Sequence, residues 1–340
     1  MRTLMCLLAL AGLAGGAEKT ELAADGLKEP FGLAFLGKDV MLTDYGGHRV
    51  ILISPEGKTT VLVGGGKAGM ADGVGEAASL NGPHNLSMLP DGRVYIADTM
   101  GHRLRLLDPK SKLLTTVGGG EKGFAGDGGP VSQAKFDQLY HVAVSPKGDV
   151  LFICDLGNRR IRQVELTKFT ITTVAGNGKK GVPVDGEPAV DQPLVDPRAV
   201  EPDAKGRLWI LERGGHALRV VENGKIRTVA GTGQAGFAGD DGPALKAKLN
   251  GPKNLFVTPA GTVLIADTEN HCIREYDPTT QTIKRVMGTG KSGKGEAGGL
   301  PTETALKRPH AVALDATGTM YVSDSDNGRV LKVAKNERKE

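Results

Sequence analysis

The chain has 340 residues, of which 50 are glycine and 18 are proline, while aromatic residues make up only 4%. This composition is rich in turns, yet it lies below the level of about 25–30% glycine and proline at which non-repetitive chains are usually disordered. The 43 basic and 39 acidic side chains are interspersed and leave a formal charge of +4. Because no basic block stands out, bulk electrostatics disfavours a nucleic-acid partner.

The first 17 residues have the composition of an export signal. Arg2 gives a positive start, residues 4–13 are apolar, and Gly15, Gly16 and Ala17 offer small residues for cleavage. The apolar stretch is too short to span a bilayer, and no later segment is long or apolar enough. We therefore expect a signal peptide at residues 1–17, cleavage near Ala17, a secreted or periplasmic mature protein, and no membrane span.

Six copies of one pattern follow along the chain: a short apolar strand, an acidic residue, a polar turn and a second apolar strand. The acidic residues lie 54 to 57 positions apart, at Asp44, Asp98, Asp155, Glu212, Asp267 and Asp324. Each unit contains four strand-like runs with alternating apolar and polar positions and turn residues between them. An antiparallel four-stranded unit repeated at a constant period is typical of a β-propeller blade.

The two ends of the repeat array complement each other. The last unit ends after its third strand, at residues 329–334, whereas Thr20–Ala24 matches the outer-strand pattern of the other units. We therefore predict an all-β fold, a six-bladed β-propeller of four-stranded antiparallel blades closed by an N-terminal outer strand, as a single domain at residues 18–340. Cys154 and Cys272 fall two blades apart, which is too far for a disulfide, and we expect buried thiols there.

The pattern of inner strand, Asp, Asn or Gly, His, Arg and apolar strand resembles the NHL repeat. Linkers such as VAGTGQAGFAGDDGPALKAKLNGP from Val229 are similar to those of the long-linker bacterial and teneurin-type members. The resemblance covers about 315 residues and implies a closed ring of six repeats. It implies no particular chemistry, because one fold hosts unrelated functions.

Two groups of repeated residues are expected to be structural. Histidine recurs after the turn in four of the six units, and we expect these side chains to hydrogen-bond the turn or a neighbouring blade: His48, His102, His216 and His271. The repeated acidic residues are expected to accept turn N–H groups. The long linkers also repeat, and we interpret them as architectural, with Phe124 or Phe237 plugging the space between blades.

The starts of the six inner strands carry residues that do not repeat, which makes them the candidate site. One column contains Phe31, His84, Tyr140, Arg198, Lys253 and His310, and the next contains Gly32, Asn85, His141, Ala199, Asn254 and Ala311. These positions ring one mouth of the central channel, on the long-linker face. We predict ligand binding by His84, Asn85, Tyr140, His141, Arg198, Lys253, Asn254 and His310.

Two cationic residues give this mouth its predicted preference for an anion. Arg198 and Lys253 come from neighbouring blades, and neither column carries a carboxylate to neutralise them. Arginine offers a planar fork for an anion and lysine a point charge. His84 and His310 would add donors below about pH 6.5, so affinity is expected to rise on mild acidification. In the rival arrangement Arg198 pairs with a nearby acidic residue: Asp196, Glu201 or Glu212.

Two enzyme families of this shape provide the alternative. Pro83-His84 and Pro309-His310 resemble two of the three Pro-His zinc ligands of the peptidyl-hydroxyglycine amidating lyase, but the third position is Arg198, which cannot bind zinc. His141 lies one residue further along its strand, where alternation points it the other way. Resemblance to gluconolactonases would use Glu29 and Asn85 or Asn254 around a divalent ion, without the required carboxylate at the mouth.

The sequence therefore favours an exported, monomeric binding scaffold that uses its long-linker face and channel mouth. The expected partner is a protein, a glycan or a small anionic or carbohydrate-like ligand, and no catalytic residue, resident metal or cofactor is assigned. The alternative function is a metal-assisted lyase or lactone hydrolase, with a divalent metal ion on His84 and His310.

Overall fold

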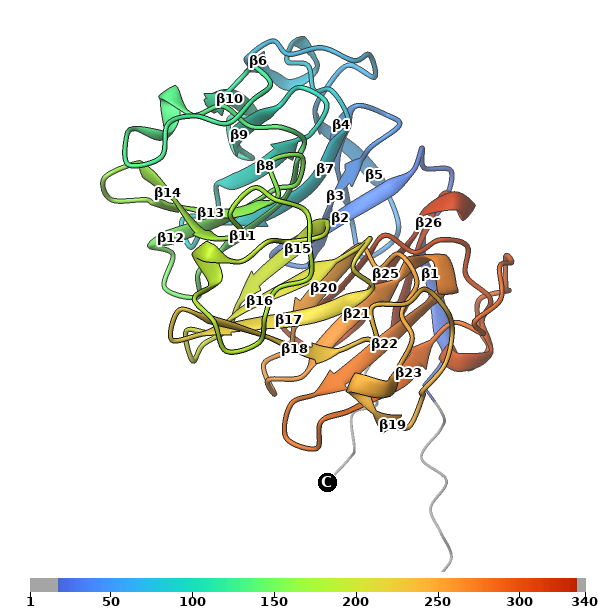
Figure 1. Cartoon of the computed structure of the whole chain (residues 1–340). Coiled ribbons are helices and arrows are strands. Elements are labelled where there is room, and N and C mark those ends of the chain that lie inside the picture. Colours follow the sequence, from blue (N-terminus) through green and yellow to red (C-terminus); the bar gives the residue numbers. More distant parts are fainter. Residues whose placement is uncertain (1–17, 335–340) are drawn as a thin grey trace, which may run out of the picture.

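A computed structural model describes residues 18–334, so the predicted signal peptide at residues 1–17 lies outside the described residues. Six antiparallel sheets are arranged in a ring (Figure 1), and the described segment contains no α-helix. The inner strands of successive blades contact one another all the way around, from β2 back to β2. The predicted six-bladed β-propeller is confirmed. Between residues 18 and 334 no helix has the length and apolarity to cross a membrane.

The first three blades follow the chain from the channel outwards. The first contains β2 (Pro30–Leu36), β3 (Asp39–Asp44), β4 (Arg49–Ile53) and β5 (Thr59–Val63). The second contains β7 (Pro83–Met88), β8 (Val94–Asp98), β9 (Arg103–Asp108) and β10 (Leu113–Gly119). The third contains β11 (Leu139–Val144), β12 (Val150–Asp155), β13 (Arg160–Glu165) and β14 (Thr170–Ala175).

The last three blades repeat this order. The fourth contains β15 (Pro197–Pro202), β16 (Leu208–Glu212), β17 (Ala217–Glu222) and β18 (Lys225–Ala230). The fifth contains β20 (Asn254–Val257), β21 (Val263–Asp267), β22 (Cys272–Asp277) and β23 (Thr282–Met287). The sixth contains β24 (Ala311–Leu314), β25 (Met320–Asp324), β26 (Arg329–Val333) and β1 (Thr20–Ala24).

Strand β1 forms the outer edge of the sixth blade, although it precedes the first blade in the sequence. It pairs antiparallel with β26, with Thr20 opposite Val333 and Ala24 opposite Val330. Figure 1 shows it beside the C-terminal strands. The first and last described strands therefore share one sheet.

The linkers add short elements to the four-stranded blades. Two-residue strands extend the second and fifth blades to five strands: β6 (Gly73–Val74) and β19 (Gly242–Pro243). Single 3₁₀ turns are η1 (Gly75–Ala77), η2 (Val131–Gln133), η3 (Ala189–Asp191), η4 (Ala244–Lys246), η5 (Thr268–Asn270), η6 (Pro301–Glu303) and η7 (Ser325–Asn327). The two short strands and five of the 3₁₀ turns come from the chain that connects one blade to the next, whereas η5 and η7 lie between the second and third strands of the fifth and sixth blades.

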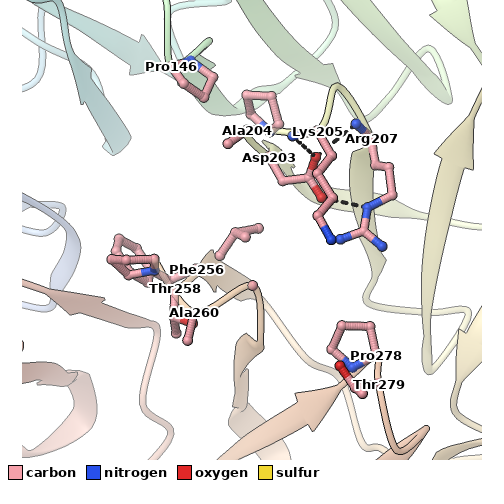
Figure 2. A pocket seen from close by; sticks show the side chains of 14 residues that line it. Pro146, Asp203, Ala204, Lys205, Arg207, Phe256, Thr258, Ala260, Pro278 and Thr279 are labelled. Atoms are coloured by element: carbon pink, nitrogen blue, oxygen red, sulfur yellow. Dashed lines mark hydrogen bonds and ion pairs between the residues drawn. The ribbon is translucent and has the colours of Figure 1, made fainter.

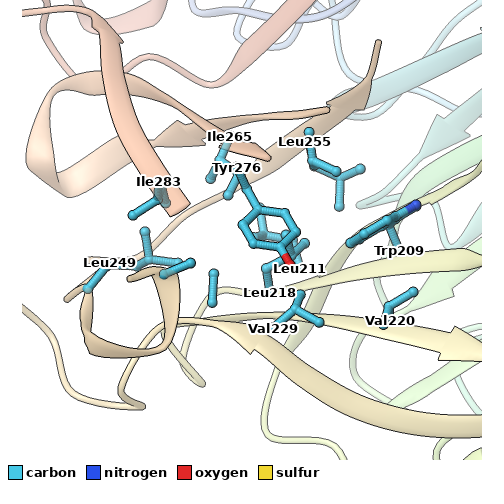
Figure 3. Packing of buried hydrophobic residues seen from close by; sticks show 14 of the residues in the cluster. Trp209, Leu211, Leu218, Val220, Val229, Leu249, Leu255, Ile265, Tyr276 and Ile283 are labelled. Carbon is cyan, nitrogen blue, oxygen red and sulfur yellow. The ribbon is translucent and has the colours of Figure 1, made fainter. Parts of the chain in front are cut away.

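The hydrophobic core is divided into six clusters, one between each pair of neighbouring blades. Figure 3 shows the cluster between the fourth and fifth blades, where Trp209 is fully buried and its ring centroid lies 6.0 Å from that of Tyr276. Elsewhere the clusters consist almost entirely of Val, Leu, Ile and Ala, as the low aromatic content requires. Burying one such side chain contributes about 1.5–3 kcal/mol, so each junction is held mainly by packing. Cys154 and Cys272 are buried free thiols, as predicted.

The repeated polar residues connect the blades, as expected. The Nδ1 atom of His48 accepts the backbone N–H of Gly82 in the next blade at 3.1 Å. His102, His216 and His271 make the same bond to the blade that follows each of them. Every repeated acidic residue accepts a backbone N–H just before the inner strand of its own blade, as Asp98 does from Asn81 at 2.6 Å. The channel mouth is thus built on a rigid frame.

The linkers are bound to the outer part of the blade that follows them. Asp127 lies 2.7 Å from Nη2 of Arg162 and also accepts the backbone N–H of Thr173 at 3.1 Å. Phe124 and Phe237 remain 42% and 44% exposed, so the prediction that they plug the space between blades is wrong. The Arg160 guanidinium covers the Phe124 ring instead, 3.8 Å from its centroid. These contacts support an architectural role for the linkers.

Candidate functional site

A β-bulge at the start of the inner strand directs the candidate side chains in three blades. The pairing between the inner strand and its neighbour skips one residue in the second, third and fourth blades, and the skipped residues are His84, Tyr140 and Arg198. An extra residue in one strand of a pair bends the strand and changes the direction of side chains. The bulge therefore turns these three residues into the channel mouth.

His141 also faces the channel. Its Nε2 atom lies 3.2 Å from Nδ2 of Asn254, and this contact joins the third blade to the fifth, so it must cross the channel. Strict alternation would place His141 opposite Tyr140, and that prediction is wrong. The bulge at Tyr140 breaks the alternation and puts both side chains on the same side.

Arg198 connects three blades at the mouth. Its Nη2 atom lies 2.6 Å from Nε2 of His84 in the second blade. Its guanidinium carbon lies 3.6 Å from the ring centroid of Tyr140 in the third blade, a cation–π contact. The structure therefore brings together His84, Tyr140 and Arg198, as the sequence predicted for a shared site.

Phe31 packs inside this ring of polar residues. Its ring stacks on His310 with centroids 3.9 Å apart and lies 4.7 Å from the ring of His84. Phe31 occupies the same position in its inner strand as the predicted ligand-binding residues in theirs. It was not predicted as a ligand-binding residue because its side chain is apolar. It fills the part of the mouth between the two histidines.

Lys253 has an acidic partner that does not lie at the start of any inner strand. Its Nζ atom lies 3.2 Å from Oε1 of Glu269, and it lies at the same distance from Nε2 of His310. Glu269 comes from turn η5, between the second and third strands of the fifth blade. The expectation that no carboxylate neutralises Lys253 is therefore wrong.

Asn85 and Asn254 hold the neighbouring inner strands. The side-chain oxygen of Asn85 accepts the N–H of Val142 at 3.0 Å, and that of Asn254 accepts the N–H of Val312 at 3.2 Å. Both residues lie at the mouth as predicted. Their oxygen atoms, however, serve the contact between blades.

Burial determines the protonation state of the mouth residues. Except for the half-buried Tyr140, the predicted site residues are at most 7% exposed. Burial, with Arg198 nearby, lowers the pKa of His84 well below 6.5 and that of His141 to about 3. Burial, with Lys253 nearby, also lowers the pKa of His310 well below 6.5. The imidazoles therefore stay neutral in mild acid, which removes the basis for the expected rise in anion affinity on mild acidification.

Arg198 has no counter-ion among residues 18–334. Its Nε and Nη1 atoms are buried without a hydrogen-bond partner in that range. The acidic residues of the rival arrangement are not paired with it: Asp196 binds Arg213 at 2.6 Å and Glu212 binds Arg219 at 2.5 Å, while Glu201 forms no ion pair with a described residue. A buried cation with two nitrogen atoms that lack a hydrogen-bond partner is the distinctive feature of this mouth.

The residues of the alternative function do not fit a metal ion. The Nε2 atoms of His84 and His310 face Arg198 and Lys253, and Nδ1 of His310 contacts the carbonyl oxygen of Arg308 at 3.0 Å. In the described part of the chain, no group of three or more His, Cys, Asp or Glu side chains is placed to hold a metal ion. The amide oxygens proposed for a gluconolactonase-like ion are already bonded to backbone N–H groups.

Comparison with known proteins gives the repeat a name. No protein-family model matches the chain. Human NHL repeat-containing protein 2 is 26% identical over 323 residues, which is 86% of this chain and 44% of that protein. The chain is an NHL-repeat β-propeller. Mouse teneurin-1 is 26% identical over 238 residues, or 59% of this chain and 8% of that protein. The NHL-repeat propeller thus spans less than half the length of these two relatives.

Solved structures share the ring architecture of this NHL-repeat propeller. A *Bacteroides thetaiotaomicron* protein of unknown function aligns with a TM-score of 0.70 and 15% identity, covering 94% of this chain and 76% of that chain. An auxiliary nutrient binding protein from the same organism aligns with a TM-score of 0.67 and 16% identity, covering 92% and 70%. Virginiamycin B lyase from *Staphylococcus aureus* aligns with a TM-score of 0.54 and 13% identity, covering 94% and 99%. At such identities the likeness concerns the fold alone.

Proposed function

We propose that this NHL-repeat propeller is an exported, monomeric binding protein whose channel mouth takes a small anion. The observation that carries the proposal is the buried Arg198 guanidinium, which has two unpartnered nitrogen atoms and no carboxylate partner among the described residues. An uncompensated buried charge is costly to the fold, and unmade buried hydrogen bonds add to that cost. A bound anion would relieve both.

The chemistry of the guanidinium supports a small oxyanion such as sulfate. Arg198 presents a planar fork, which suits the oxygen atoms of sulfate, phosphate or a carboxylate. His84 and Tyr140 hold the guanidinium in place, so little conformational freedom remains to be lost on binding. The surrounding residues are at most 7% exposed apart from Tyr140, which favours a small ligand over a polymer.

The same surroundings support binding over catalysis. The three imidazoles of the mouth are neutral and contact cations or amides, so none is placed as a metal ligand. The fold also accommodates binding proteins, since one solved propeller of this shape is described as an auxiliary nutrient binding protein. Export is part of the same proposal and is supported by the apolar stretch at residues 4–13.

Sulfate titration by isothermal calorimetry tests the proposal. We expect saturable binding to the wild type and a loss of about 10- to 100-fold in Arg198→Leu, the scale of a hydrogen bond to a charged group. Thermal stability of Arg198→Leu should not fall, because the change removes a buried charge without a partner. Arg93→Leu is the matched control, since Arg93 is paired with Asp91 at the opposite rim of the propeller and should not affect sulfate binding.

The proposal fails if the wild type shows no saturable sulfate binding, or if Arg198→Leu binds sulfate as tightly as the wild type. A marked loss of stability in Arg198→Leu would also contradict it, because that result would mean that Arg198 forms an ion pair in the folded protein. Phosphate and acetate titrations at constant ionic strength then rank the anions that fit.

A further inference from the structure

A pocket of about 470 Å³ lies at the opposite end of the propeller from the channel mouth. The inner strands begin at the long-linker face and end at this rim, where the turns after β11, β15 and β20 come together. Figure 2 shows the turn with Lys205 and Arg207 on one side of the pocket and Phe256 on the other, with Pro278 below. A volume of this size suits a small organic molecule.

One turn supplies the charges of the pocket. Asp203 accepts the backbone N–H groups of Lys205 and Arg207, Nε–H of Arg207 at 2.6 Å and the indole N–H of Trp209 at 3.1 Å. Its carboxylate is therefore fully used inside the turn. The turn carries two cationic side chains and one carboxylate, which leaves one positive charge at the pocket.

Arg207 is fixed in place with one edge free. Its side chain is only 13% exposed, its Nε is bound to Asp203 and its guanidinium carbon lies 4.9 Å from the Trp209 ring centroid. Neither Nη atom makes a hydrogen bond to a residue within 18–334, and Lys205 forms no ion pair in that range. Two cationic groups on one rigid turn thus have unused donors at the pocket.

The opposite wall is apolar. Phe256 and Val257, at the end of β20, line the pocket, and prolines from three turns complete it: Pro146, Pro259 and Pro278. Phe256 packs against the core clusters of the fifth and sixth blades and is therefore held in place. A ligand that suits this pocket needs an anionic end for the turn and an apolar body for the wall.

We infer that this pocket binds a small monocarboxylate with an apolar body, such as an aromatic acid. One unneutralised positive charge matches a monoanion, and the free edge of a guanidinium matches the two oxygens of a carboxylate. Burial of the ring against Phe256 and Val257 supplies the apolar contribution to affinity. The site shares no residue with the channel mouth, so it is independent of the anion site at Arg198.

Benzoate titration, followed by calorimetry and ligand-observed NMR, tests this inference on the full-length protein. We expect saturable benzoate binding and no measurable binding of benzamide, which has the same shape without the charge. Arg207→Lys keeps a charge beside Asp203 but loses the planar fork, and it should weaken binding about tenfold. Lys205→Gln removes an exposed charge that the fold does not use and should also weaken binding.

Two controls isolate the pocket. Lys110→Gln removes an exposed lysine from the same rim in the second blade and should leave benzoate binding unchanged. Arg198→Leu should also leave it unchanged, because Arg198 lies at the other end of the inner strand. Benzamide binding equal to that of benzoate, no saturable benzoate binding, or unchanged affinity in both Arg207→Lys and Lys205→Gln would each overturn the inference.

Discussion

Arg198 and Lys253 occupy equivalent positions in neighbouring blades, yet their electrostatic surroundings differ. Lys253 lies 3.2 Å from a carboxylate of Glu269, whereas Arg198 has only the neutral His84 and the ring of Tyr140 beside it. Burial lowers the pKa of Lys253 to about 8 and that of Arg198 to about 10. Arg198 therefore stays charged over the whole physiological range, while Lys253 can lose its proton in mild alkali.

This difference predicts how anion binding depends on pH. Sulfate affinity should be constant from about pH 5 to about pH 7 and should fall above about pH 8, as Lys253 loses the positive charge that supports the site. Calorimetric titration of sulfate, whose charge does not change in this range, measures the effect. In Lys253→Met the alkaline fall should be absent; an affinity that rises steeply below about pH 6.5 would instead indicate that the imidazoles protonate.

Glu201 lies three residues beyond Arg198 on β15 and forms no ion pair with a described residue. Burial raises its pKa from 4.5 to about 8, so the folded state holds a proton that the unfolded state releases. Its contribution to stability is present below about pH 4.5 and is lost as the pH rises through about 8.

We therefore expect Glu201→Gln, which keeps the shape and stays neutral, to melt at the same temperature as the wild type near about pH 4.5 and at a higher temperature above about pH 8. Thermal denaturation followed by circular dichroism over this range measures the difference. Glu201→Asp is the matched acidic control and should not show the alkaline gain. A melting difference that does not change with pH would contradict the assignment.

At the scale of elements, β1 completes a sheet with only five residues. Thr20 is fully buried, and Ala23 and Ala24 are at most 9% exposed in the cluster between the sixth and first blades. Removing the strand would expose the edge of β26 and that cluster.

Deletion of residues 18–26 should therefore lower the free energy of unfolding by several kcal/mol or cause aggregation, a large part of the roughly 5–15 kcal/mol that stabilises a domain. Chemical denaturation of the two forms measures the loss. Leu22→Thr is the control, since Leu22 is 48% exposed on the same strand and should change little. Equal stability of the deleted and complete proteins would refute the contribution of β1.

The sequence predicted the elements better than it predicted the contacts at the site. The bounds of β1 follow from its match to the other outer strands, because the repeat fixes where an outer strand must be. The bulge at Tyr140 could not be predicted, since skipping one residue in the pairing leaves almost no trace in the apolar pattern. Glu269 was missed because it reaches Lys253 from a turn that is distant from the inner strand. Arg198 lacks a carboxylate partner because Asp196 pairs with Arg213 and Glu212 pairs with Arg219. The sequence alone does not show which arginine each carboxylate pairs with.

At the scale of the whole ring, four of the six junctions contain a histidine whose Nδ1 atom accepts a backbone N–H of the next blade. His102 accepts the N–H of Gln138 at 3.0 Å through Nδ1, which a protonated imidazole cannot do. Arg159 and Gly328 take this position in the third and sixth blades, so those two junctions lack the bond. Burial lowers the pKa of His102, His216 and His271, and stability from these groups is therefore lost as the pH falls below about 6.5.

Replacing one of these histidines by asparagine separates the loss of stability caused by histidine protonation from the effects of other titrating groups. Asparagine tolerates the positive φ of 50° at position 102 and can accept the same N–H without titrating. We expect His102→Asn to lose less stability than the wild type between about pH 7 and about pH 4.5, measured by thermal melting. Parallel melting curves of the two proteins over this range would show that the junction does not depend on the charge of the imidazole.

The pairing of β1 with β26 also has a mechanical consequence. Because Thr20 lies opposite Val333, the residues next to the two ends of the array leave the sheet side by side. A force that pulls these ends apart therefore loads the hydrogen bonds of this pair one after another, as in a zipper, and not all together in shear. The ring should open between β1 and β26 under low tension and then release its blades in succession. Extension in optical tweezers should therefore begin with a short, low-force step whose length corresponds to the release of β1.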